Sequence, residues 1–256
     1  MSLKLALILA FLAQSAWAVQ PFCVAHRSLG FGGLENSLSA LENASTQQAD
    51  AIEFDVVHTK DMKSIIYHDK SLKRLAVGET CPLREKIKDL QLEDIREKCL
   101  LKNGEKIPLL EEGLEILSLG QSLLFIEFKD SIITKNDVEI IKKYYGDRPE
   151  KVAIISFHEE VLSLVKQWSL SDDFLSKIKT VLLKKFGFFR GQKSADFLSA
   201  KYIHKSRAQR LRNKGMLVGA YTKNEVDKIE KYLDKDLDFI TTNEYKRCRE
   251  LVEKRK

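Results

Sequence analysis

The sequence has 256 residues, 44% of them hydrophobic, which is enough to bury the core of one large α/β domain. After residue 18 no stretch is long and apolar enough to cross a bilayer, so we exclude a membrane-spanning body. The net charge of +6 comes with no nucleic-acid recognition motif, so we also exclude nucleic acid as a partner.

The first eighteen residues have the pattern of a secretory signal peptide. A lysine near the start precedes an apolar run from Leu5 to Ala13, and the small residues Ala16 and Ala18 form an A-x-A cleavage site. A membrane anchor is the alternative, but the apolar run is short for that role. We therefore expect cleavage after Ala18, export to a periplasm or the medium, and one mature domain over residues 19–256.

Short apolar runs predict eight strands. They cover residues 22–26, 51–57, 123–128, 152–157, 180–184, 201–204, 217–222 and 238–242. Segments with apolar residues three and four apart predict helices between them, at residues 108–120, 136–146, 159–168 and 225–233. Strands that alternate with helices imply parallel strands and right-handed crossovers. Eight such units predict an α/β fold of the (β/α)₈ TIM barrel type, with an open doubly wound sheet as the alternative.

One polar segment, residues 70–106, interrupts this alternation and predicts a small insertion that packs as a cap at one end of the barrel. In an oxidising compartment, the four cysteines predict two disulfides rather than four free thiols. Cys81 and Cys99 bracket the insertion, so we expect them to pair, and Cys23 would then pair with Cys248. No C-x-x-C spacing is present, so a zinc site is not expected.

Polar residues stand at the carboxyl ends of several predicted strands, where the active sites of TIM barrels lie. Glu53 and Asp55 are two residues apart on one strand and therefore face the same side. With Glu127 from another strand they would supply three hard oxygen ligands, which suit Mg²⁺ or Ca²⁺. The alternative is a set of salt bridges with Arg27 and Lys129.

His26 and His68 close two further strand-like segments at the same end. An imidazole can accept or donate a proton near neutral pH, whereas the other three histidines are expected to be structural. A metal, Arg27, Lys129 and two histidines at one rim indicate a phosphate ester as substrate, because cations hold its oxygens while imidazoles move protons.

Six motifs occur in this order: "AHRSLGFGGLENSLSAL", "ADAIEFDVVHTKD", "IIYHDKSLKR", "KIPLLEEGLEIL", "FIEFKD" and "DFITTN". In order and spacing they resemble the glycerophosphodiester phosphodiesterase family of TIM barrels, over nearly the whole of residues 19–256. The resemblance implies a role for each matching residue. His26 and His68 match the acid and base, Glu53, Asp55 and Glu127 the metal ligands, Arg27 and Lys129 the phosphate contacts, and Glu35 an acid beside the site.

Four positions depart from the family's pattern. Ser28 replaces a glycine, Leu34 replaces a proline, and Ser37 replaces a threonine while keeping a hydroxyl that can cap the next helix. Tyr221 stands near the seventh strand, where the family usually has tryptophan, and we expect its ring to line the mouth. Because of these changes, the geometry of the loop and the substrate preference cannot be carried over from the family.

The resemblance implies metal-dependent hydrolysis of a small glycerophosphodiester to an alcohol and sn-glycerol 3-phosphate. The alternative is an exported lysophospholipase D-like enzyme that acts on lipid phosphodiesters. Its basis is "KKFGFFR", where Phe186, Phe188 and Phe189 could dock on a lipid surface or else pack under their loop. A barrel that binds without turnover is a third hypothesis, and retention of both histidines and all three carboxylates argues against it.

Residues 184–214 contain ten Lys or Arg and one acidic residue, Asp196. Such a stretch attracts phosphate-bearing surfaces or simply forms solvated helix faces, and the sequence favours the second interpretation slightly. The sequence gives no basis for an oligomeric state.

Overall fold

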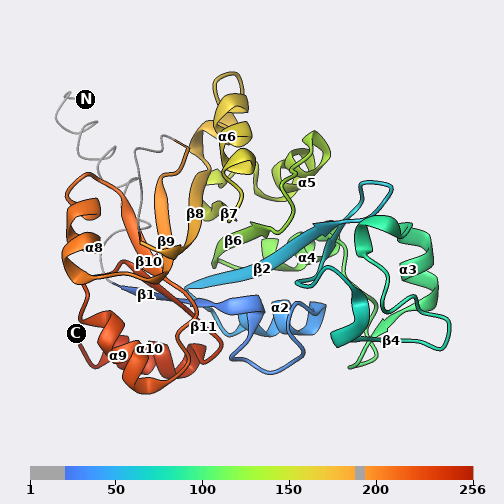
Figure 1. Cartoon of the computed structure of the whole chain (residues 1–256), viewed down its shortest axis with the longest axis horizontal. Coiled ribbons are helices and arrows are strands. Elements are labelled where there is room, and N and C mark those ends of the chain that lie inside the picture. Colours follow the sequence, from blue (N-terminus) through green and yellow to red (C-terminus); the bar gives the residue numbers. More distant parts are fainter. Residues whose placement is uncertain (1–20, 188–193, 256) are drawn as a thin grey trace.

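The structure, a computed structural model, describes residues 21–187 and 194–255 (Figure 1). Eight parallel strands close into a barrel in the order β1-β11-β10-β9-β8-β7-β6-β2, and β2 pairs with β1 to complete the ring. They are β1 (Phe22–Ala25), β2 (Ala51–His58), β6 (Leu123–Phe128), β7 (Val152–Ser156), β8 (Lys179–Phe186), β9 (Phe197–Tyr202), β10 (Leu217–Ala220) and β11 (Phe239–Thr242). The predicted TIM barrel is confirmed and the open sheet is wrong. The predicted signal peptide lies outside the described residues.

Seven strands overlap their predicted positions closely, and β9 does not. The prediction placed this strand at residues 201–204, whereas it begins at Phe197 and ends at Tyr202. The buried Ser199 interrupts the apolar run at the start of β9, and Lys201 and Tyr202 at its end are exposed. The predicted range therefore overlaps only the last two residues of the strand, Lys201 and Tyr202.

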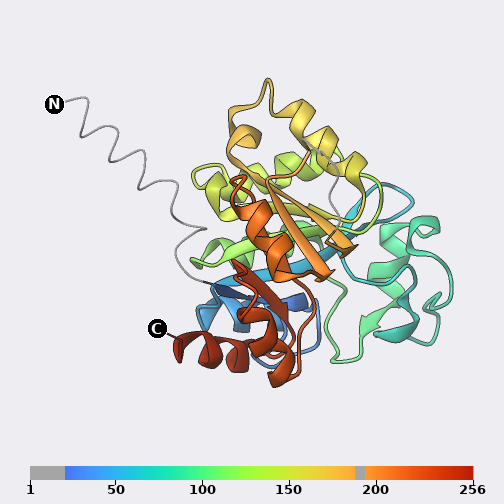
Figure 2. The ribbon, with the colours of Figure 1, turned by 60° about the vertical axis from the view of Figure 1, so that its left-hand side comes forward.

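Helices surround the barrel (Figures 1 and 2). They are α2 (Leu38–Thr46), α4 (Leu110–Ser118), α5 (Lys135–Tyr145), α6 (Glu159–Trp168), α7 (Asp173–Lys177), α8 (Lys205–Arg212), α9 (Val226–Leu233) and α10 (Tyr245–Glu253). The four predicted helices correspond to α4, α5, α6 and α9. Ser37 caps α2 as expected, since its Oγ accepts a hydrogen bond from the Ala40 amide at 3.2 Å.

Among the described residues, no helix has the length and apolar character needed to span a membrane.

The predicted insertion lies beyond the carboxyl end of β2 (Figure 1). A short antiparallel strand, β3 (Ser64–Ile66), first pairs with the end of β2. The chain then forms η3 (Leu72–Arg74), β4 (Ala76–Val77), η4 (Ile87–Asp89), α3 (Leu92–Lys98) and β5 (Leu100–Leu101), with β4 and β5 paired antiparallel. The insertion has its own apolar core, which includes Tyr67, Leu72, Ile87 and Ile95.

Both predicted disulfides are present. Cys81 pairs with Cys99 inside the insertion, and Cys23 on β1 pairs with Cys248 on α10. The second bond links the first strand of the barrel to its last helix. The described part of the chain contains no free cysteine.

Aromatic rings fill the amino-terminal end of the barrel interior. The ring of Phe239 lies 5.6 Å from that of Phe22 and 5.2 Å from that of Phe125, and Phe197 lies beside them. Gly219 makes room for this layer, because a Cβ added there would lie 2.1 Å from the Phe239 ring. This layer closes the barrel interior at its amino-terminal end, so the interior opens at the carboxyl end of the strands.

Candidate active site

The first strand ends in a tight turn that presents His26 and Arg27 to the barrel mouth. Arg27 and Ser28 both have positive φ, at 52° and 61°. Glycine adopts this conformation more readily than other residues, which gives a physical reason for the glycine that the family has at Ser28. The turn directs the Arg27 amide toward Glu53, and this N–H donates to Oε2 at 2.7 Å.

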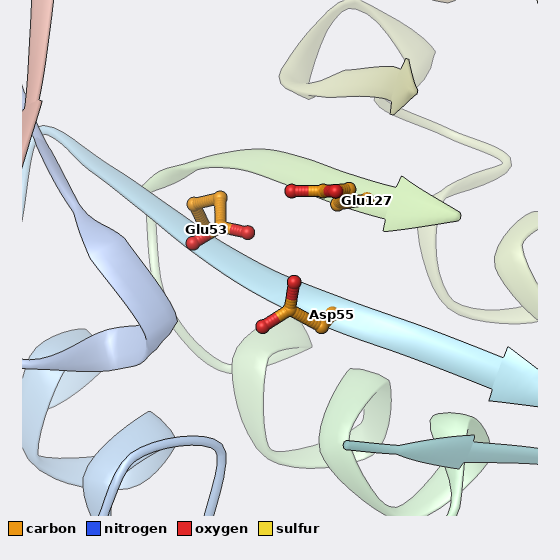
Figure 3. A group of neighbouring side chains, drawn as sticks. All are labelled: Glu53, Asp55 and Glu127. Atoms are coloured by element: carbon orange, nitrogen blue, oxygen red, sulfur yellow. The ribbon is translucent and has the colours of Figure 1, made fainter. Parts of the chain in front are cut away.

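Glu53, Asp55 and Glu127 form a compact group inside the mouth (Figure 3). Asp55 and Glu127 are register partners on the neighbouring strands β2 and β6, and Glu53 lies one inward position earlier on β2. Each carboxylate offers one oxygen that lies within 4.8 Å of the other two. All three are buried, and Glu53 Oε1 has no hydrogen-bond partner among the described residues.

The three carboxylates repel one another. Burial, together with the charges of Asp55 and Glu127, holds the pKa of Glu53 well above its usual range. Burial and Asp55 raise the pKa of Glu127 to about 7. Three hard oxygen donors, of which Glu53 Oε1 and Asp55 Oδ1 accept no hydrogen bond among the described residues, fit a divalent cation, which would relieve both the repulsion and the desolvation.

Lys129 and Arg27 also flank the carboxylates, so the salt bridges that were the alternative to a metal are present as well. Lys129 Nζ lies 2.6 Å from Glu127 Oε1 and 3.3 Å from Asp55 Oδ1. Arg27 Nε lies 3.5 Å from Asp55 Oδ2. These cations make the pKa of Asp55 lower than usual even though burial acts to raise it. Both cations line the mouth, where they can also face an anionic substrate.

Each of the two histidines forms a hydrogen bond through its Nδ1 atom. His26 Nδ1 lies 2.6 Å from the side-chain Oδ1 of Asn243, and the main-chain N–H of Asn243 donates to Asn224 Oδ1 at 2.9 Å. His68 Nδ1 lies 2.7 Å from Asp69 Oδ1. Burial and the Arg27 charge lower the pKa of His26 to about 4, and burial also lowers the pKa of His68. The His26 ring is therefore neutral at neutral pH, whereas Asp55 and Asp69 act to raise the pKa of His68 against the effect of burial.

A chain of ion pairs connects the two sides of the mouth. Arg27 Nη1 donates to Glu35 Oε1 at 2.8 Å, and Arg74 Nη2 donates to the same oxygen at 2.6 Å. Arg74 Nε then donates to Asp69 Oδ2 at 2.6 Å, and Asp69 holds His68. Glu35 thus contacts two arginines rather than the cavity.

Sequence reasoning assigned no role to Arg74 or Asn243. Both occur inside motifs that were noted, Arg74 six residues after His68 and Asn243 directly after the last strand. A polar residue at the carboxyl end of a barrel strand was the available signal for Asn243. Arg74 had no such signal, because it lies in the insertion.

The cavity at the mouth has a volume of about 160 Å³ and two unlike walls. The first set of lining residues, the polar wall, consists of His26, Arg27, Glu53, His68, Glu127 and Lys129. The second set, which we call the apolar wall, consists of Ile155, Phe157, Leu183, Tyr221, Thr222 and Thr241. Tyr221 lines the mouth as predicted, with its hydroxyl donating to the Lys184 carbonyl at 2.9 Å and its ring edge-on to Phe157. Sequence reasoning missed Phe157, which follows β7.

The rim beside the apolar wall carries exposed rings. Phe186 is 51% exposed and stacks on Tyr202, which is 48% exposed. The interpretation that Phe186 packs under its loop is therefore wrong. Phe188 and Phe189 lie outside the described residues.

Residues 26–247 match the model of the glycerophosphoryl diester phosphodiesterase family. A glycerophosphodiester phosphodiesterase of Caldanaerobacter subterraneus subsp. tengcongensis is 34% identical over 155 residues, which are 56% of this chain and 61% of that protein. A lysophospholipase D of Homo sapiens is 27% identical over 47% of this chain and 41% of its own length. The chain thus spans about three fifths or less of these relatives.

A solved structure shows the same fold. An Oleispira antarctica phosphodiesterase in complex with the product sn-glycerol-3-phosphate superposes with a TM-score of 0.74. The match covers 93% of this chain and 99% of that one at 19% identity. Similarity at this identity supports the barrel fold.

Proposed function

Because this chain belongs to the glycerophosphoryl diester phosphodiesterase family, we propose that it hydrolyses glycerophosphodiesters to an alcohol and sn-glycerol 3-phosphate. One observation carries the proposal: three buried carboxylates, two cationic side chains and two histidines converge on one cavity. That combination can hold a phosphodiester and move the two protons that its hydrolysis requires.

Glu53, Asp55 and Glu127 would hold Mg²⁺ or Ca²⁺ in this proposal. When bound, the cation would neutralise charge on the phosphate oxygens. Arg27 and Lys129 would hold the same phosphate group from the rim of the cavity. The apolar wall, which includes Phe157 and Tyr221, would contact the carbon atoms of the substrate.

The partners of the two histidines support a different role for each in this proposal. The amide oxygen of Asn243 accepts from the His26 Nδ1–H, so Nε2 is free to accept a proton, and His26 acts as the base toward the attacking hydroxyl or water. The Asp69 carboxylate stabilises a protonated His68, which acts as the acid toward the leaving alkoxide. When water attacks, a new P–O bond forms, the bond from phosphorus to the alcohol oxygen breaks, one proton passes to His26 and one passes from His68 to the alcohol. When the glycerol hydroxyl attacks, the same transfers give a cyclic phosphodiester, which a water molecule then opens to glycerol phosphate with the two histidines in exchanged roles.

The experiment is release of glycerol phosphate from glycerophosphocholine by the purified protein. We expect release to stop with a chelator and to return with added Mg²⁺ or Ca²⁺. Glu127→Gln should lose this response, whereas Glu115→Gln, on the exposed face of α4, should retain it. Release that a chelator does not affect would contradict the role of the carboxylates.

A lipid phosphodiester is the second candidate substrate, as for a lysophospholipase D. The exposed Phe186 and Tyr202 at the ends of β8 and β9 favour it, because amphipathic rings at a rim can enter a lipid surface. Ser substitutions at both positions should reduce vesicle co-sedimentation and activity on lysophosphatidylcholine. The matched control substitutes Leu119 and Leu170, which are equally apolar and 87% exposed elsewhere. Equal effects of the two double variants would remove the lipid argument.

We also propose that the protein is exported with loss of residues 1–18. Two disulfides are typical of proteins that fold in oxidising compartments. Mass spectrometry of the protein from periplasmic and medium fractions should give Val19 as the first residue. An intact leader in the cytosolic fraction alone would contradict export.

A further inference from the structure

A second cavity, of about 220 Å³, lies beside the candidate active site. It is lined by Val57, His58, Lys70, Lys86, Ile87, Lys88 and Asp130. Two segments that line the first cavity continue into it, since Lys70 lies two residues after His68 and Asp130 directly follows Lys129. The second cavity is therefore at the same end of the barrel, between β2 and the insertion. We refer to it by its three lysines as the lysine pocket.

Main-chain contacts hold the lysines of this pocket together. The Ile87 amide donates to the Lys70 carbonyl at 2.9 Å, and a bridge pairs Ser71 with Lys86. Ile87 is buried in the core of the insertion, which fixes the lysines on both sides of it. The arrangement of charges thus follows from the fold of the insertion rather than from mobile side chains alone.

The lysine pocket has an excess of positive charge. Within the described ranges, Lys70, Lys86 and Lys88 form no ion pair, and all three are exposed. Asp130 is the acidic residue that lines the pocket. Its carboxylate accepts the His58 amide N–H at 3.0 Å and also faces the His58 ring. Asp130 is thereby occupied and does not neutralise the lysines.

His58 adds a further cation at the base of the pocket. Its Nε2 lies 3.0 Å from Asp137 Oδ2, and Asp130 Oδ2 lies 3.5 Å from Nδ1. Burial opposes the charge of the ring, but the two carboxylates raise the pKa of His58 to about 9. His58 therefore balances one of these carboxylates at neutral pH, and the three lysines remain available to an anion.

We propose that the lysine pocket binds a second phosphate group, carried by the alcohol portion of the substrate. The inference rests on the proposed function and narrows its substrate class to glycerophosphodiesters whose leaving alcohol bears a phosphate. Lys70 follows His68 by two residues, at most about 7 Å along the chain, so the lysine pocket lies near the first cavity and one extended molecule can place a phosphate in each. Lysine ammonium groups are suitable ligands for such a phosphate because they are point charges on flexible stems.

The test compares two substrates that differ only in this phosphate: glycerophosphoglycerol and its phosphate monoester. Wild-type protein should have the higher kcat/KM for the monoester. The variant K70Q/K86Q/K88Q should lose about tenfold or more of kcat/KM for the monoester and stay within about twofold on glycerophosphoglycerol. The control K214Q/K231Q/K254Q removes the same charge from exposed positions elsewhere and should leave both values unchanged. Equal losses on both substrates, or no loss, would overturn the proposal.

A direct measurement separates this inference from the proposed function. Inorganic phosphate, titrated into chelator-treated protein, should shift the imidazole NMR signals of His58 in wild type and in the control, but not in K70Q/K86Q/K88Q. Absence of a shift in wild type would overturn the lysine pocket even if both substrates are hydrolysed. If neither substrate is hydrolysed, the proposed function fails while this titration still decides whether the pocket binds phosphate. Binding of phosphate without discrimination between the substrates would overturn the assignment to the leaving alcohol.

Discussion

The two ends of the barrel interior use the same strands for opposite purposes. On β6, Phe125 packs against Phe239 at the amino-terminal end, whereas Glu127, the next inward position, faces the carboxylates of β2. The change from an aromatic core to a buried acidic group thus occurs within two residues. The comparison shows that stability and chemistry are separated by depth in this barrel, not by strand.

The two ends also differ in the interactions that stabilise their side chains. At the amino-terminal end, burial of apolar area, including the rings of Phe22, Phe125 and Phe239, stabilises the fold. At the mouth, buried carboxylates repel one another and depend on Arg27, Lys129 and the proposed cation. We therefore expect substitutions at the first end to lower stability and substitutions at the second end to lower activity.

Removal of either histidine should reduce activity more than any other single change. His26→Ala and His68→Ala should each lower kcat by about 10²- to 10⁴-fold, because each removes a proton transfer. The unfolding midpoint should change little. His204→Ala is the control, since this exposed histidine precedes α8 away from the cavity. Wild-type turnover in either variant would show that the mouth is not the reaction site.

A pair of substitutions on β6 tests the separation by depth directly. Phe125→Ala should lower the free energy of unfolding by about 3–5 kcal/mol, because a large buried ring is lost. Glu127→Gln should stabilise the metal-free protein at pH 8, because one of three buried like charges is removed. Urea unfolding measures both. A similar loss of stability in the two variants would remove the distinction between the two ends.

The contribution of the insertion to the mouth depends on Arg74. Arg74→Ala should lower kcat by about tenfold, because Glu35 and Asp69 lose the guanidinium that contacts them both. Arg74→Lys should restore part of the lost activity. The pH profile of kcat should also shift, because Asp69 contacts His68. Arg96→Ala is the matched control: Arg96 binds Glu112 bidentately from the same insertion but does not contact this chain of ion pairs. An equal effect of both substitutions would indicate a purely structural role.

The pH dependence of stability should give the smallest effect. The pKa of Glu127 is about 7 in the folded protein and near 4.5 when unfolded, so the folded state binds more protons between these values. The stabilisation from this group is complete below about pH 4.5 and is lost as pH rises to about 7. Urea unfolding of the metal-free protein should therefore show a steeper decline over this range for wild type than for Glu127→Gln. Parallel pH curves would contradict the raised pKa.

The sequence predicted the barrel because buried parallel strands and amphipathic helices give distinct periodicities. It misplaced β9, where Ser199 interrupts the apolar pattern inside the barrel. It also named no bounds for α7, α8 and α10, and in α8 only Ala208 and Leu211 are buried. Both errors occur where tertiary position, rather than local periodicity, decides which residues are covered.

The metal-ligand candidates could be predicted because strand alternation places Glu53 and Asp55 on one side and strand ends gather at one rim. The partners of the histidines could not. Asn243 reaches His26 across 217 residues of sequence, and Arg74 reaches Glu35 across 39. Such contacts depend on the order of strands in the ring and on the docking of the insertion, and neither is encoded in local pattern.

The disulfide between Cys23 and Cys248 makes the domain a covalent ring. It spans 225 residues of sequence and joins β1 to α10 beside the seam where β1 pairs with β11. A peptide bond cut in any loop within this ring would leave a single covalently connected molecule, with both new ends held by the rest of the barrel. The chain is therefore topologically circular over almost the whole catalytic domain, and proteolytic nicks open the ring without dividing it.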